Sequence, residues 1–346
     1  TVSFGGQTTR LNQVDAIYNA LNSKADDGSG AQKFYTEAQI DAMFADGAGF
    51  MNAALNGTGK KVRSKTSAGC AAGNSATQAQ FDDQIADFTA NVVSAWSADA
   101  SAGVAGKLTD ATRSIHVNGA GHEIDQTFVK GLIGGMCLDQ IVNNYLQPCQ
   151  LDSGTRRDDN TNGTLASGKN YTDMEHKWDE AFGYLYGQEA DYSRADLGSA
   201  PTGNGTTLNK YFKKINDSNM PGISQTVYDA FKLGRAAIVA GNYEVRDAQA
   251  NIIKINLSKV IGYKSVDYLN GYMSKMAAGN TADAFHALSE GYGFIMSLQF
   301  TNDGNDNPHF TKAEVDAMLA KLSDFWTVKD SDLTSMVSQI KSKMNI

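Results

Sequence analysis

The sequence predicts an all-α protein in which two helical bundles pack around a central polar site. Long segments carry apolar residues at helical spacing, and no segment shows the alternation typical of a strand. Only 4 prolines occur among the 346 residues, whereas the 34 glycines cluster between the periodic segments. This distribution favours long helices joined by polar loops.

The apolar periodicity places the helices in order along the chain. In the first half we expect helices at residues 8–21, 36–44, 50–55, 80–97 and 121–145. In the second half we expect helices at residues 171–187, 208–215, 224–240, 247–276 and 281–300, with two more that start at Thr311 and Ser331. Residues 60–74 and 189–207 have no period and are expected to be loops.

A polar stretch at residues 150–170 separates the two halves of the chain. It predicts a boundary between an N-terminal bundle, residues 1–150, and a C-terminal bundle, residues 151–346, within one compact unit. Arg10 falls in the first turn of the first predicted helix, which is an unfavourable place for a cation. Either a buried acidic partner or exposure to solvent would explain it.

The composition excludes some classes of partner. Hydrophobic residues make up 41% of the chain and charged residues 20%, which is an ordinary globular balance. A formal net charge of −8 makes nucleic acid an unfavourable partner. No run of about 18 apolar residues is present, so we expect no membrane span. The chain opens without a methionine, from which we expect that a targeting segment has been removed.

The predicted helix at residues 121–145 combines apolar and ionisable side chains in an unusual way. An apolar stripe at fourfold spacing runs through it: Ile124, Phe128, Leu132 and Met136. Four ionisable residues are set into the same segment: His122, Glu123, Asp125 and Lys130. Gly131, Gly134 and Gly135 weaken a helix by about 1 kcal/mol each, so we expect a neighbouring helix to approach closely here.

A histidine followed three residues later by an aspartate occurs twice. The two pairs are His122 with Asp125 and His176 with Asp179. Because a spacing of three places both side chains over one helical turn, each pair is expected to reach a common point. A carboxylate and an imidazole from each of two helices form a known type of metal site in bundles, suited to iron, zinc or manganese. The alternative is that each histidine packs locally.

Other charged residues extend this prediction. The predicted metal ligands are completed by two glutamates beside the pairs, Glu123 and Glu180. A supporting polar network is predicted from six further side chains: Arg10, Lys130, Glu175, Arg235, His286 and Glu290. His286 and Glu290 share a face of a late helix, so they either complete the same polar centre from a third direction or form a local hydrogen bond.

A second candidate metal site precedes the helix that starts at Thr311. Oxygen donors stand at positions 1, 3, 5, 9 and 12 of a calcium-type loop: Asp303, Asn305, Asn307, Thr311 and Glu314. Position 6 is Pro308, where glycine is needed for the sharp turn. Thr311 with Glu314 is equally typical of a capping box, so a capped helix is the alternative to bound calcium.

The three cysteines are Cys70, Cys137 and Cys149. A helix followed by a turn would bring Cys137 and Cys149 together, so they are the candidate disulfide, with Cys70 on an exposed loop. Several common catalytic motifs are absent from the sequence: a glycine-rich phosphate loop, a Cys-x-x-Cys zinc pair and a serine nucleophile elbow. His122-Glu123 opens like a zinc-protease helix, but the second histidine is replaced by Gln126.

Six segments of the chain resemble the bacterial lipoprotein family known as domain of unknown function 4856. The segments are residues 6–11, the His122 helix, and residues 171–183, 234–238, 268–270 and 288–290. The run Glu-His-x-Trp-Asp-Glu-Ala-Phe-Gly at 175–183 is the most specific. The resemblance extends from about residue 1 to residue 300 and implies an exported, lipid-anchored protein of the Gram-negative envelope.

More distantly, the two histidine helices are similar to imelysin and iron-regulated protein A. Those exported all-α proteins consist of two bundles and are associated with iron uptake, and some were proposed to be metallopeptidases. Their Gly-x-His-x-x-Glu signature corresponds to Ala-Gly-His-Glu-Ile-Asp at residues 120–125. The first glycine and the last glutamate are therefore both replaced.

Together these observations lead to a functional hypothesis. We expect an imelysin-like protein of the periplasm or outer-membrane surface that binds a metal ion, first of all iron, or a small ligand at the His/carboxylate centre. Contact with a membrane is expected only through a removed lipid anchor. The alternatives are a non-catalytic scaffold lipoprotein with an envelope protein as its partner, and a metallopeptidase in which Glu123 or Glu180 is the general base.

Overall fold

Helices dominate the computed structural model, which describes residues 2–70, 75–191, 203 and 205–346. The predicted all-α class is confirmed, with thirteen α-helices and one small hairpin in the described part of the chain. None of the described helices is both long and apolar enough to cross a bilayer. The predicted loops 60–74 and 189–207 include residues 71–74, 192–202 and 204, which lie outside the described residues.

The first half contains six α-helices and the hairpin. Its α-helices are α1 (Gly5–Ala20), α2 (Glu37–Asp41), α3 (Ser75–Asp87), α4 (Ile124–Leu132), α5 (Pro148–Leu151) and α6 (Arg156–Thr161). Turns of π-helix continue several of them: η1 (Ala42–Asp46), η4 (Phe88–Val93), η5 (Ile133–Leu138) and η6 (Ile141–Tyr145). Single 3₁₀ turns are η2 (Ala53–Leu55) and η3 (Arg63–Lys65).

The second half contains the longest helices. Its elements are α7 (Asp173–Tyr186), α8 (Leu208–Asp217), α9 (Ile223–Val239), α10 (Tyr243–Ala277), α11 (Thr281–Ser297), η7 (Leu298–Phe300), α12 (Lys312–Lys321) and α13 (Asp330–Met344). The capping boxes that the sequence indicates are present at the starts of α7, with Thr172 and Glu175, and of α12, with Thr311 and Glu314.

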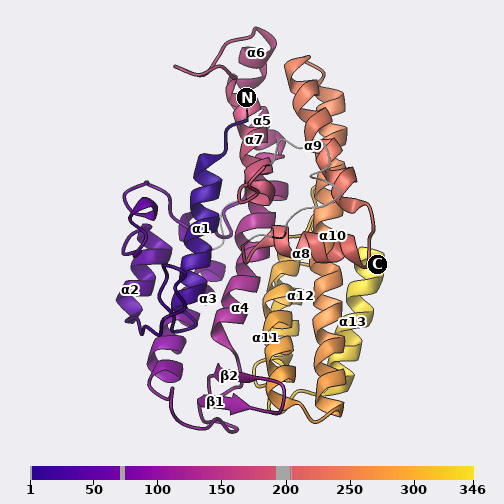
Figure 1. Ribbon diagram of the computed structural model, residues 1–346. Helices are drawn as coiled ribbons and strands as arrows, with labels where there is room; N and C mark the ends of the chain where they lie inside the picture. Colours follow the sequence, from indigo (N-terminus) through magenta and orange to yellow (C-terminus); the bar gives the residue numbers. More distant parts are fainter. Residues whose placement is uncertain (1, 71–74, 192–202, 204) are drawn as a thin grey trace.

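The hairpin was not predicted from the sequence. Strands β1 (Gly106–Thr109) and β2 (Ser114–Val117) pair antiparallel, with Gly106 opposite Val117. Each strand has only four residues, which is too short for an alternating pattern to be recognised. The hairpin contacts α11, and Figure 1 shows it at the lower end of α4 and α11.

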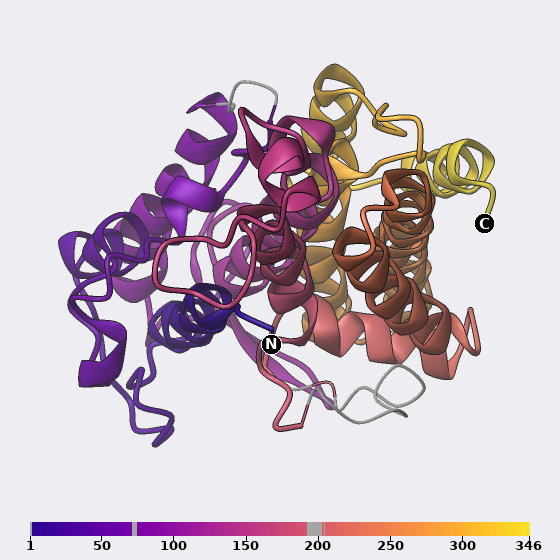
Figure 2. The same cartoon turned by 90° about the horizontal axis from the view of Figure 1, so that it is seen from above.

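The helices of the two halves share one hydrophobic core. Viewed from above in Figure 2, the elements of residues 5–93 lie on one side, α9–α13 lie on the other, and α4 and α7 stand between them. α1 packs on α7, α4 packs along α11, and α10 packs against α9, α11 and α13. The proposed boundary at residues 150–170 stays a prediction.

The close helix approach predicted for the glycines after Lys130 is present between α4, η5 and α11. A Cβ atom added to Gly134 would overlap the side chain of Ser297 on α11. The hydroxyl of Ser297 instead accepts a hydrogen bond from the Gly134 amide at 3.1 Å and donates to the carbonyl of Lys130 at 3.0 Å. The loss of helix propensity at this glycine is thus offset by backbone contact between helices.

We expect Gly134→Ala to lower the free energy of unfolding by about 1–3 kcal/mol, because the new methyl group overpacks the contact with Ser297. Gly135→Ala is the matched control, since a Cβ there meets nothing closer than 3.5 Å. The control should be as stable as the wild type or slightly more stable. Urea unfolding followed by circular dichroism measures both, and equal effects of the two substitutions would contradict the packing argument.

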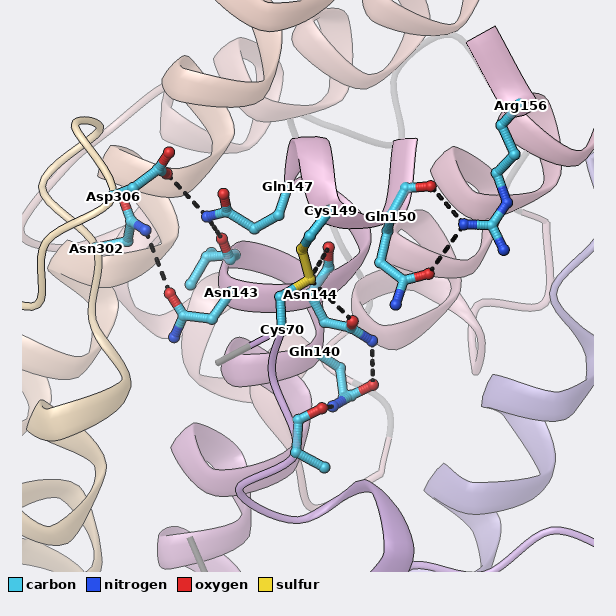
Figure 3. Close-up of a disulfide and its surroundings, with 12 residues drawn as sticks. Cys70, Gln140, Asn143, Asn144, Gln147, Cys149, Gln150, Arg156, Asn302 and Asp306 are labelled. Carbon is cyan, nitrogen blue, oxygen red and sulfur yellow. Dashed lines mark hydrogen bonds between the residues drawn. A yellow bond between two sulfur atoms is a disulfide. The ribbon is translucent and has the colours of Figure 1, made fainter. Parts of the chain in front are cut away.

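The disulfide joins Cys70 to Cys149, so the prediction of a Cys137–Cys149 bond is wrong. Figure 3 shows this bond beside the polar side chains of η6. The segment before Cys70 follows the π-helical turns closely: the amides of Ser67 and Cys70 donate to the carbonyls of Gly135 and Asn143, at 2.7 and 2.8 Å. This pairing delivers Cys70 to α5, whereas Cys137 is fully buried within η5.

Peptide mapping by mass spectrometry under non-reducing conditions should recover a linked Cys70–Cys149 pair and a free Cys137. Burial raises the pKa of the Cys137 thiol to about 12, so we expect alkylation of this residue only after unfolding. Cys149→Ser should lower the free energy of unfolding by about 2–5 kcal/mol. Recovery of a Cys137–Cys149 peptide would refute the assignment.

Candidate functional site

His122 precedes α4 rather than lying on it. Gly121 has a φ of +86°, and the helix begins only at Ile124. The His122 ring packs against Phe325, with centroids 4.4 Å apart, and its Nε2 donates to the carbonyl oxygen of Leu322 at 2.9 Å. Burial lowers the pKa of His122. The side chain is therefore a neutral packing group at the α12 end.

His176 and Asp179 belong to two different networks, although both lie on α7. His176 stacks on Tyr171 with centroids 5.2 Å apart, and its Nε2 lies 4.0 Å from an oxygen of Glu180. Asp179 instead pairs with Nε of Arg235 at 3.0 Å. Burial raises the pKa of Asp179 to about 6, even though the charge of Arg235 acts in the opposite direction.

The structure does not bring His122, Asp125, His176 and Asp179 together at one point. The two histidines line different cavities, and each of the four side chains already has a local partner. In the part of the chain that the structure describes, no three His, Cys, Asp or Glu side chains are grouped so as to hold a metal ion. These four residues therefore do not fit a shared iron or zinc site.

A different set of charged residues does meet between α4 and α11. Nδ1 of His286 lies 2.6 Å from Oε2 of Glu123, and its Nε2 lies 3.5 Å from Oε2 of Glu290. Glu290 is also 3.5 Å from Nζ of Lys130 and accepts a hydrogen bond from the hydroxyl of Tyr211 at 3.1 Å. The sequence-predicted Glu123, Lys130, His286 and Glu290 are thus brought together in one row, in which the two carboxylates alternate with the imidazole and the ammonium group.

The row continues along α4 to the end of α1. Lys130 donates to Oε1 of Gln126 at 2.7 Å, and Nε2 of Gln126 donates to Asp125 at 2.9 Å. Asp125 also accepts from the side chain of Asn22 at 2.8 Å. Asp125 is therefore held by amide groups rather than by a histidine. We call the row from Glu123 to Asn22 the polar centre.

The electrostatics of the polar centre differ at its two ends. Burial, followed by the charge of Glu123, raises the pKa of Asp125 well above its ordinary value. Burial is the strongest single influence on Glu290 and raises its pKa, but the charges of Lys130, His286 and Lys214 and the hydrogen bond from Tyr211 together outweigh it, so that pKa lies below its ordinary value. Asp125 consequently takes up a proton more readily than an ordinary carboxyl group does.

A cavity of about 280 Å³ opens beside the Asp125 end of the polar centre. The acidic side chains of Glu123 and Asp125 line it together with His286. Trp96 and His116 form one wall, with their rings stacked at 3.5 Å. Convergent polar groups in a concave site fix the orientation of a bound ligand, and this cavity provides them.

Several members of the centre were not predicted. Asn22, Tyr211 and Gln126 were absent from the candidate residues, although Gln126 stands four residues before Lys130, at a spacing that places both on one helical face. Asn22, which follows the end of α1, and Tyr211 of α8 reach the centre through the tertiary fold alone. No local pattern in the sequence marks them.

The remaining predicted residues lie away from the polar centre. Arg235 joins Glu175 at 2.6 Å as well as Asp179, and Lys177 holds Glu180 at 2.6 Å. The guanidinium of Arg10 is buried, and the helix begins at Gly5, so Arg10 is not in its first turn. Arg10 is not exposed to solvent, and no acidic side chain among the described residues pairs with it: it donates to backbone carbonyls.

The candidate calcium loop has the contacts of a capped helix. The hydroxyl of Thr311 accepts from the Glu314 amide at 3.3 Å, and Glu314 pairs with Lys343 of α13. Asp303 accepts from the amides of Asn305 and Asn307, at 2.7 and 3.1 Å, and so closes its own turn. Calcium binding stays a prediction, and these contacts favour the alternative.

The fold and the centre define an all-α protein with a buried, ion-paired polar row beside a small cavity. The chain belongs to the family described as Domain of unknown function (DUF4856), whose model matches residues 1–346, as the sequence resemblance predicted. Neither the curated proteins nor the solved structures contain a match to it.

Asp125 should make stability fall with rising pH. A carboxyl whose folded pKa exceeds its unfolded value of 3.8 stabilises the fold fully below that value, and the contribution is lost as the pH rises through the folded pKa. We expect Asp125→Asn to flatten this decline in urea unfolding measured from pH 4 to pH 8. The exposed Asp83→Asn is the control, and parallel curves for wild type and Asp125→Asn would contradict the assignment.

Proposed function

We propose that the protein is a non-catalytic binding protein of the bacterial envelope that holds a small ammonium-bearing molecule in the cavity beside the polar centre. The observation that carries the proposal is the pair of carboxyl groups, Glu123 and Asp125, facing one polar cavity. Burial, followed by the charge of Glu123, raises the pKa of Asp125, and a bound cation would offset the repulsion between the two carboxylates.

The basic residues of the cavity are consistent with this ligand. Arg113 is paired with Asp283 at 2.9 Å, and Lys24 is exposed at the surface. Burial lowers the pKa of His116, so its imidazole adds no charge at neutral pH. The interior of the cavity is therefore acidic and its outer edge basic. A zwitterion such as an amino acid would match both parts.

The disulfide supports the proposed export. Structural disulfides persist in oxidising compartments such as the periplasm and are rare in the cytosol. The Cys70–Cys149 bond joins segments 79 residues apart, which suits an exported protein. A lipid anchor and a place in the periplasm or on the outer membrane are proposed from the family resemblance.

Iron or zinc is the second candidate ligand, because Glu123, Asp125 and His286 are donor types that these metals accept. It is less well supported, because no three His, Cys, Asp or Glu side chains of the described residues are grouped so as to hold a metal ion. The metallopeptidase hypothesis has a further weakness: neither Glu123 nor Glu180 is a free base. A scaffold function would leave the cavity without a ligand.

Isothermal titration calorimetry with putrescine, lysine and glycine should show binding by at least one amine. The affinity should rise with pH, by at most about tenfold per pH unit, because Asp125 must lose its proton. Iron and zinc salts form the second arm of the experiment. Asp125→Asn and Glu123→Gln should each abolish amine binding, whereas Asp83→Asn should not.

Binding of iron or zinc without amine binding would replace the proposed ligand class by a metal. Binding that is unchanged in Asp125→Asn would overturn the site itself. If neither arm shows binding, and Asp125→Asn changes only the stability, the scaffold function would be supported.

A further inference from the structure

A second cavity, of about 440 Å³, lies at the opposite end of α1 from the polar centre. It is enclosed by the start of α1, the segment at residues 60–65, the loop at residues 169–171 and the first turns of α7. Five cationic side chains line it: Arg10, Lys60, Lys65, Lys169 and Lys177. Glu180 is the one acidic lining residue in the part of the chain that the structure describes. We call this the cationic cavity.

The single carboxylate is already occupied. Glu180 pairs with Lys177 at 2.6 Å and accepts hydrogen bonds from Gln7 at 3.0 Å and from Tyr145 at 3.3 Å. It therefore neutralises Lys177 and leaves four cations of the cavity without a carboxylate partner among the described residues. An excess of positive charge in a concave site attracts anions.

Arg10 is the least ordinary member of the group. Its residue is only 8% exposed, yet it donates to two backbone carbonyls, those of Lys61 at 3.1 Å and Gly6 at 3.4 Å. No carboxylate of the described chain pairs with it. A buried charge without a counter-charge lowers the stability of a fold, so its presence calls for an anion that is supplied from outside.

Lys65 also forms no ion pair with a carboxylate of the described residues. Burial, followed by the charge of Arg10, lowers the pKa of its ammonium group. Its Nζ lies 5.4 Å from the ring centre of Tyr145, and Nζ of Lys177 lies 5.6 Å from the same ring. The two ammonium groups thus share one aromatic ring at the wall of the cavity.

The start of α1 adds to the positive potential. Gly5 and Gly6 line the cavity, and the first turn of the helix has neither an acidic residue nor a side-chain cap. Amide groups at a helix N-terminus bind phosphate groups readily. The Lys60 side chain lies directly against Gly6, so an ammonium group and the helix end face the same space.

We propose that the cationic cavity binds a phosphate-bearing small molecule, with Arg10, Lys60 and Lys65 as its main contacts. A phosphate group carries about −1.5 to −2 charges at pH 7 and three acceptor oxygens, so it matches several cations better than a single carboxylate does. The stacked rings of Tyr171 and His176 form a flat wall for the rest of the molecule. The proposal is independent of the amine site.

Thermal unfolding and calorimetry with inorganic phosphate and pyrophosphate test the proposal, in buffers of constant ionic strength. Both anions should raise the melting temperature at millimolar concentration, pyrophosphate more than phosphate, by the linkage of binding to folding. Lys60→Gln/Lys65→Gln should weaken pyrophosphate binding by on the order of tenfold or more. Without ligand, this variant should melt at or above the wild-type temperature, since like charges are removed.

The control variant Lys329→Gln/Lys341→Gln loses the same charge at exposed positions and should bind pyrophosphate as the wild type does. If the cavity variant Lys60→Gln/Lys65→Gln does not fold, the single variant Lys65→Gln replaces it. Equal binding by the cavity and control variants would overturn the site. Tighter binding of citrate than of pyrophosphate would overturn the phosphate class. If sulfate, chloride and pyrophosphate raise the melting temperature equally, the effect is a general salt effect. This result would also overturn the phosphate class.

Discussion

The burial of charge between α4 and α11 is the constraint on which the rest of the structure depends. Lys130 and Glu290 face each other across two helices whose backbones nearly touch. A Cβ at Gly293, one turn beyond Glu290, would overlap Lys130. The absence of a side chain at Gly293 therefore makes the ion pair sterically feasible. Because a buried charge must be compensated, the helices cannot shift along one another without leaving Glu290 or Lys130 unpaired.

The π-helical turns that follow α4 hold a second, distant segment of the chain. A π-helical turn leaves carbonyl groups outside the regular hydrogen-bond pattern of the helix, and two of these, at Gly135 and Asn143, accept amides of the segment at residues 67–70. The segment is thereby held along η5 and η6 up to the Cys70–Cys149 bond (Figure 3). On the other side, Gln147 and Lys254 both reach Asp306, so the later loop is secured to the same region.

Local patterns predicted the elements better than the contacts between them. Periodicity identified most helices, and the Thr172 and Thr311 boxes marked two starts correctly, because these signals depend on neighbouring residues alone. His122 was misplaced, since a left-handed glycine before it delays the helix to Ile124. The partner of Cys149 and the approach of Asn22 depend on segments distant in sequence. The sequence indicated which charged residues are candidates for the centre, but it did not indicate which of them pair with one another.

α1 separates two cavities of opposite character. Arg10 lies towards its start, in the cationic cavity, and Asn22 follows its end, beside Asp125. A helix carries a partial positive charge at its N-terminus and a partial negative charge at its C-terminus. The dipole of α1 thus favours an anion in the first cavity and a cation in the second. No acidic residue in its first turn and no basic residue in its last turn opposes that field. The same helix that joins the two halves of the core therefore sets the sign of the charge that each cavity attracts.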